Sequence, residues 1–216
     1  MGRKVIDKTG EINYNNFGSK MVIKEYRCAK DIDVYFPEYD WTFEHAQYTH
    51  FKRCYDPKLQ EKYSTYKGCK VEDFFLNFQH IAEWIEKNYY EVPGEQMCLD
   101  KDILYKGNKI YSKESCIFVP ERINLLFVKS NKSRGDNPIG VDQLPSGNYR
   151  VRCSNGYGKQ IPLGTYSTEE EAFRVYKEHK EKVIKEVIDS YKGIIPEPHY
   201  SRLKTAMYNY KVEIDD

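Results

Sequence analysis

Two arginines in the C-terminal half of the chain, Arg150 and Arg152, stand two residues apart in a run of alternating polar and apolar residues. Residues two apart on a β-strand share one face, so a strand here would direct both guanidinium groups the same way. Arginine reads guanine in the DNA major groove through paired hydrogen bonds. The plainer interpretation, two ordinary solvated strand residues, stays open.

Other basic residues nearby suit contacts to phosphate. Residues 129–160 hold six Lys or Arg against two Asp, although the whole chain has a net charge of only +1. Lys159, at the start of the next predicted strand, could join the two arginines, and Lys129, Lys132 and Arg134 would add affinity without sequence information. The small net charge excludes a strongly basic nucleic-acid coat and an acidic DNA mimic, so any DNA contact must come from such local clusters.

Three short strands and one helix must position these residues. The strands are predicted over residues 139–141, 148–153 and 159–165. Gly147 and the Asn-Gly pair at 155–156 supply the turns. Thr168 and Glu171 form a capping box at the start of an amphipathic helix, which Gly193 ends as a left-handed cap.

This segment resembles the Apetala2-type DNA-binding domain. The stretch Leu163–Ala172 follows the pattern Leu-Gly-x-Tyr-x-Thr-x-Glu-Glu-Ala, and Gly140, Gly147 and Tyr176 also agree. The resemblance implies a three-stranded antiparallel sheet packed on one helix, with double-stranded DNA as the partner.

A second segment resembles the HNH nuclease motif of phage homing endonucleases. The matching stretches are Leu99–Asp102, Gly107–Lys109, Tyr111–Cys116, Phe118–Pro120 and Arg122–Asn124. The order of the two modules and the basic segment between them resembles phage proteins that pair an HNH-like unit with an Apetala2-type domain. The likeness extends roughly from the first predicted strands to the tail.

The HNH resemblance implies a β-hairpin and a helix that hold one divalent metal, Mg²⁺ or another ion, against a DNA phosphate. It places Asp100 and Asn124 at the metal-ligand positions. Lys101 stands where the catalytic histidine, the general base, is found, and Ser115 matches the residue that steadies that histidine.

The lysine is the main departure from the family pattern. A lysine has an ordinary pKa near 10.4 and makes a poor base at neutral pH, and the carboxylates around Lys101 favour its charged form. We therefore expect an impaired nuclease centre. Three interpretations stay open: turn and surface charges alone, a metal site with little cleavage, and a working metal-dependent endonuclease.

The front of the chain predicts a mixed region of strands and helices. Period-two runs predict strands over 21–26 and 32–36, and apolar spacing predicts helices over 42–55 and 71–89. A last strand is expected within 208–216. No role is assigned to the front region.

The predicted fold class is α+β: an N-terminal mixed β/α region, a central ββα (HNH-like) unit, and a C-terminal three-stranded antiparallel sheet packed on one helix. The predicted boundaries are 1–55 for the strand and helix region, 56–128 for a helix plus the ββα unit, 129–138 for the basic linker, 139–193 for the Apetala2-type domain and 194–216 for the tail.

Cysteine spacing and hydropathy narrow the remaining possibilities. None of the six cysteines forms a Cys-x-x-Cys pair, so no zinc site is expected. The start lacks a signal peptide and no run of about 18 apolar residues occurs, so we expect reduced thiols, no membrane partner and the cytoplasm of the phage-infected bacterial host. One rival to DNA binding stays open: a phage factor that binds and blocks a host or defence protein. The sequence assigns no oligomeric state.

Overall fold

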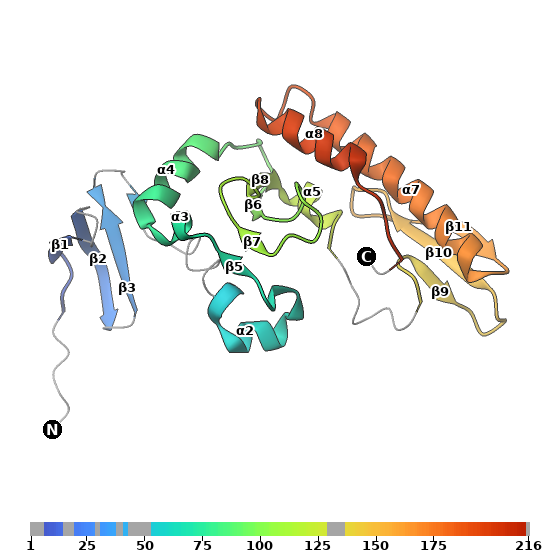
Figure 1. The fold of residues 1–216 in the computed structure, drawn as a ribbon, viewed down its shortest axis with the longest axis horizontal. Helices are drawn as coiled ribbons and strands as arrows, with labels where there is room; N and C mark the ends of the chain where they lie inside the picture. The colour runs from blue at the N-terminus through green and yellow to red at the C-terminus, as the bar shows by residue number, and fades with distance from the viewer. Residues whose placement is uncertain are drawn as a thin grey trace. The chain divides into compact units, whose positions relative to one another are not determined.

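The computed structural model describes residues 7–14, 20–28, 31–37, 41–42, 53–128 and 137–214 (Figure 1). They belong to two compact units, one formed from residues 1–87 and 109–114 and the other from residues 88–108 and 115–216. Most of the helix predicted over 42–55 lies outside the described residues; residues 53–55 are helical. In the described part of the chain, no helix combines the length and the apolar character needed to cross a bilayer.

The first unit contains an antiparallel sheet in the order β1-β2-β3-β4. Its strands are β1 (Ile12–Tyr14), β2 (Lys20–Cys28), β3 (Asp31–Phe36) and β4 (Trp41–Thr42). The predicted pair of strands corresponds to β2 and β3, which pair with Val22 opposite Tyr35. The period-two pattern therefore predicted this hairpin.

The helix predicted over 71–89 is interrupted in the structure. Its span contains the end of β5 (Lys70–Val71), then α3 (Asp73–Leu76) and α4 (Phe78–Asn88). Asn77, between the two helices, has an extended backbone (φ −84°, ψ 119°), which cannot continue an α-helix.

The short helix α2 (Pro57–Lys62) is capped by Asp56, whose side chain accepts from the backbone N–H groups of the first turn. Strand β5 pairs in parallel with β7 (Ile110–Tyr111).

The second unit begins with the expected strand, long turn, strand and helix. β6 (Met97–Asp100) pairs antiparallel with β8 (Ile117–Pro120), with Asp100 opposite Ile117, and α5 (Glu121–Leu125) follows β8 directly. All four residues of β8 are buried. Helix α5 packs back against β6, so these elements adopt a ββα arrangement, named here the ββα unit (residues 97–108 and 115–125). Residues 109–114, which contain β7, belong to the first unit.

The C-terminal sheet has the order β11-β10-β9 and packs on one helix, as predicted. The elements are β9 (Val141–Gln143), β10 (Tyr149–Ser154), β11 (Gln160–Tyr166) and α7 (Glu169–Ser190). Thr168 caps α7 by accepting from the backbone N–H of Glu171 at 3.2 Å. Gly140 has φ +76°, and a Cβ there would lie 2.1 Å from the Tyr176 ring, so only glycine fits at this contact between the sheet and α7.

The tail differs from the prediction of a final strand. Residues 199–209 form helix α8 (His199–Asn209), and residues 210–213 form no strand. The buried face of α8 carries Tyr200, Leu203 and Met207 at helical spacing, and the helix packs on α7. That burial, rather than local strand preference, decides the conformation of this segment.

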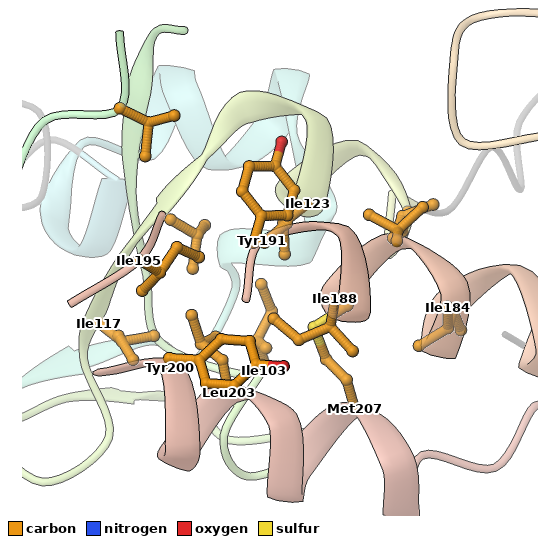
Figure 2. Close-up of a cluster of buried hydrophobic side chains, with 14 of the residues drawn as sticks. Ile103, Ile117, Ile123, Ile184, Ile188, Tyr191, Ile195, Tyr200, Leu203 and Met207 are labelled. Carbon is orange, nitrogen blue, oxygen red and sulfur yellow. The ribbon is translucent and has the colours of Figure 1, made fainter. Parts of the chain in front are cut away.

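One hydrophobic core joins the ββα unit to the two C-terminal helices (Figure 2). It contains Ile103, Ile117 and Ile123 from the ββα unit, and the second half of α7 and α8 supply many of its other side chains. The first half of α7 covers the sheet instead, where Ala172 and Tyr176 pack on Val151. Helix α7 thus contributes to both cores, and residues on either side of the 129–138 segment share one of them.

Candidate nucleic-acid interface

Strand β10 alternates between buried and exposed side chains. Val151 and Cys153 face α7 and are buried, whereas Arg150 and Arg152 are exposed on the opposite face. Successive side chains of a strand point to opposite faces of the sheet, so burial of the apolar pair fixes the direction of both arginines. The structure therefore places Arg150 and Arg152 together on the outer face, where the sequence pattern expected them.

A carboxylate on the neighbouring strand links the two arginines. Asp142 of β9 lies directly opposite Arg150 in the sheet register. Its Oδ2 accepts from Arg150 Nη2 at 3.2 Å, from Arg152 Nη2 at 2.6 Å and from Arg152 Nε at 3.0 Å. Burial acts to raise the pKa of Asp142, but the hydrogen bonds from Arg152 and Arg150 together outweigh it and lower that pKa.

Arg150 and Arg152 are named here the arginine pair. Together with Asp142 they keep a net positive charge on an exposed surface. Exposed ion pairs are weak, so a phosphate or a base edge can displace the carboxylate from either guanidinium. Sequence reasoning missed Asp142. Its position depends on the pairing of β9 with β10, which the local pattern does not contain.

Lys159 lies in the turn between β10 and β11, one residue before β11 begins. The turn is organised by Asn155, whose Oδ1 accepts from the backbone N–H groups of Tyr157 at 2.8 Å and Lys159 at 3.1 Å. Lys159 is exposed at this end of the hairpin. The sequence pattern predicted it as the first residue of the strand, which instead begins at Gln160.

The same turn is fixed to the ββα unit. Arg122 of α5 donates from Nε to the carbonyl oxygen of Gly156 at 2.8 Å. A Cβ at Gly156 would lie 2.6 Å from a methyl carbon of Val187 on α7, so the turn approaches α7 closely. Arg122, which sequence reasoning did not single out, therefore helps to position the hairpin that carries the arginine pair.

Asp100 ends strand β6 and closes the turn that follows. Its Oδ1 accepts from the backbone N–H groups of Asp102 and Ile103, both at 2.7 Å. Burial, reinforced by the nearby Asp102 carboxylate, raises the pKa of Asp100 to about 6. One carboxylate oxygen of Asp100 thus serves the turn.

Lys101 is buried, with 7% of its surface exposed. Its Nζ donates to Asp102 Oδ2 at 3.0 Å, and its backbone oxygen accepts from Asn108 Nδ2 at 2.7 Å. The ion pair with Asp102 favours the charged form of Lys101. Lys101 is therefore arranged as a fixed positive charge and not as a proton acceptor.

Asn124 and Ser115 occupy the remaining HNH-like positions. Asn124 is half-buried on α5, the helix that packs on β6, and Ser115 is buried just before β8. Among the described residues, no three His, Cys, Asp or Glu side chains gather into a metal-binding cluster, so a divalent ion would depend on Asp100, Asn124 and water. The Lys101 Nζ already donates to the Asp102 carboxylate at 3.0 Å, so Asp102 is engaged in an ion pair rather than placed as a further ligand. As they stand, these residues fit a divalent metal poorly.

Lys129, Lys132 and Arg134, the expected phosphate contacts of the basic segment, lie outside the described residues. The structure brings Arg150 and Arg152 together and gives Asp100, Lys101, Ser115 and Asn124 places in one ββα unit.

Comparison with known proteins adds no family to this description: no protein-family model, curated protein or solved structure matches the chain.

Proposed function

We propose that the protein binds double-stranded DNA through the outer face of the C-terminal sheet. The observation that carries the proposal is the arginine pair: two guanidinium groups side by side on an exposed strand whose other face is fixed against α7. The major groove admits a two-stranded β-ribbon, and arginine binds the O6 and N7 acceptors of guanine with two hydrogen bonds. A rigid sheet with two such donors suits that task.

Asp142 supports the proposal by orienting the donors before DNA arrives. Because one carboxylate oxygen binds both arginines, the two long side chains lose less conformational freedom when they bind a base. The exposed carboxylate also repels phosphate, which disfavours non-specific placement of the arginine pair on the DNA backbone.

Backbone contacts would come from neighbouring basic residues. Lys159 extends from the turn at one end of the hairpin, and we assign Lys129, Lys132 and Arg134 to phosphate contacts as well. Such contacts fix the register of a protein on the duplex and carry no sequence information. The site of action would be DNA in the cytoplasm of a phage-infected bacterium, as the family resemblance implies.

The proposed DNA-binding protein has a degenerate nuclease centre. Its general-base position is filled by Lys101, which is buried and paired with Asp102. A second function, metal-dependent nicking or cutting, is favoured by one observation: Asp100 and Asn124 lie on the strand and the helix of a ββα arrangement. We rank it second because Lys101, whose Nζ is held as a donor to Asp102, disfavours the proton transfer.

The proposal is tested by selecting bound duplexes from a random DNA library with the wild-type protein, then measuring affinity for the selected site. Arg152→Ala and Arg150→Ala should each weaken that affinity by about 1–3 kcal/mol and relax the base preference. Lys182→Ala is the matched control, because Lys182 is an exposed cation that pairs across one helical turn with Glu186. Equal affinities for the three variants and the wild type would refute the role of the sheet.

A further inference from the structure

A groove of about 670 Å³ runs along helix α8 in the second unit. One wall is the loop that follows Asp100, residues 103–106, and the other is α8 together with the tail at 210–213. The loop begins where Ile103 N–H donates to Asp100, so the groove starts beside the ββα unit. Neither the sequence motifs nor the arginine pair account for it.

Both polar and apolar side chains line the groove, and its charged side chains carry an excess of positive charge. Lys106, Arg202 and Lys211 line it against a single acid, Glu213. Helix α8 itself contains no acidic residue (His199–Asn209). Lys106 donates to Glu213 Oε2 at 2.8 Å and to the backbone oxygen of Lys211 at 2.7 Å. This pairing neutralises Glu213 and holds the tail against the loop. Lys211 pairs in turn with Glu181 Oε2 of α7 at 3.4 Å, so three cations face two acids and a net positive charge remains at the groove.

Hydrogen-bonding side chains form a row along the same wall. Ser201, Thr205 and Asn209 recur every four residues on α8 and are exposed. Residues four apart lie on one face of a helix, about 6 Å apart along its axis. On the opposite wall, Tyr105 exposes 58% of its surface. Serine, threonine, asparagine, arginine and lysine are the side chains that contact DNA phosphates and sugars.

We propose that this groove binds the sugar–phosphate backbone of one DNA strand. The inference rests on the proposed DNA-binding function and deepens it by naming a second contact surface. The arginine pair would select the sequence, and the groove would hold the backbone that passes the ββα unit. Its ligand is a polyanion recognised by charge and by polar donors, so binding there is independent of base sequence.

The test uses the full chain and a duplex of arbitrary sequence, with affinity measured by fluorescence anisotropy over a series of salt concentrations. Thr205→Glu places a negative charge in the groove at an exposed helical position, where glutamate is a good helix former. It should weaken binding by roughly tenfold. Thr205→Gln, of the same shape without the charge, should bind within about twofold of the wild type. Arg202→Gln should reduce the slope of log affinity against log salt by about 1.

Lys182→Glu, on the exposed side of α7, controls for the change in net charge, and circular dichroism checks that each variant is folded. If Thr205→Glu binds no more weakly than Lys182→Glu while Arg152→Ala loses its selected site, the groove is refuted and the sheet proposal stands. If the groove variants weaken binding and Arg152→Ala does not, the groove is supported and the sheet assignment fails. A wild-type protein that binds no DNA at low salt overturns both.

Discussion

The guanidinium carbon of Arg122 lies 3.7 Å from the centroid of the Tyr157 ring, with the cation stacked over the aromatic face. Arg122 belongs to helix α5 of the ββα unit, and Tyr157 belongs to the turn between β10 and β11. Together with the hydrogen bond from Arg122 to Gly156, this stacking fastens the hairpin of the arginine pair to the ββα unit.

Removing Arg122 should therefore destabilise the second unit. Arg122→Ala loses the hydrogen bond to a backbone carbonyl and the cation–π contact, and we expect a loss of about 1–3 kcal/mol in the free energy of unfolding. Urea denaturation measures it. Tyr157→Phe keeps the aromatic face and should change stability little, whereas Tyr157→Ala should cost about 1 kcal/mol. Equal unfolding midpoints for Arg122→Ala and the wild type would contradict the role of Arg122.

Asp142→Asn should strengthen binding to DNA of arbitrary sequence several-fold at low salt. The substitution removes a negative charge that lies 2.6 Å from Arg152 and 3.2 Å from Arg150, so both guanidinium groups meet phosphate without competition. Anisotropy titration provides the measurement, and Glu186→Gln, an exposed acid on α7, controls for net charge. Weaker binding by Asp142→Asn would indicate that Asp142 contacts DNA or that its orienting effect dominates.

Wild-type protein should leave supercoiled plasmid intact in magnesium or manganese, because Lys101 stands at the general-base position and its Nζ is held as a donor to Asp102 at 3.0 Å. Lys101→His replaces that cation with an imidazole whose ordinary pKa near 6.5 suits a general base. We expect this variant to gain metal-dependent nicking that a further Asp100→Ala change abolishes. Nicking by the wild type would support the endonuclease alternative, and no gain in Lys101→His would mean that Lys101 is not the main defect.

Acid should destabilise the second unit through His199. This histidine is 7% exposed and stacks on Tyr90 with ring centroids 5.1 Å apart. Burial lowers its pKa, Arg202 lowers it further, and Glu197 opposes the shift only in part. The unfolded chain therefore binds the proton more readily, so the stability contributed by neutral His199 is complete above the unfolded pKa of about 6.5 and is lost as pH falls through the folded pKa.

His199→Phe keeps an aromatic ring against Tyr90 and cannot titrate. Urea denaturation of both proteins between about pH 7.5 and about pH 5 should show the wild type losing more stability with acid than the variant. The two proteins share every other titrating group, including Asp100, so the difference between their curves isolates His199. Parallel curves would contradict the assignment.

Residue periodicity within a single strand or helix predicted the local structure well, whereas helix breaks and the packing of one element on another were missed. The alternation around Val151 is produced by burial against α7 and can be seen in the sequence. The break at Asn77 cannot be seen in the sequence, because the apolar spacing continues through this position although the backbone there is extended. Helix α8 was missed because residues 194–216 were treated as a tail with a last strand within 208–216, although Tyr200, Leu203 and Met207 keep helical spacing.

The candidate site divides in the same way. Arg150 and Arg152 follow from strand periodicity alone. Asp142 and Arg122 act across strands and between helix and turn, so only the pairing register and the packing of the chain reveal them. The burial of Lys101 likewise depends on the fold of its turn, which the residue types alone do not determine.

Helix α7 gives the protein a particular evolutionary constraint. Its first turns complete the core of the sheet, and its later turns complete the core of the ββα unit. If the sheet and α7 (residues 137–193) were separated from the rest of the second unit, Val183, Ile184, Val187 and Ile188 of α7 would be exposed to water. The ββα unit would lose the same side chains from its hydrophobic core. Recombination that moved the sheet and α7 into another gene would therefore leave an incomplete hydrophobic core in both products. The sheet and the ββα unit must be inherited, and must diverge, together.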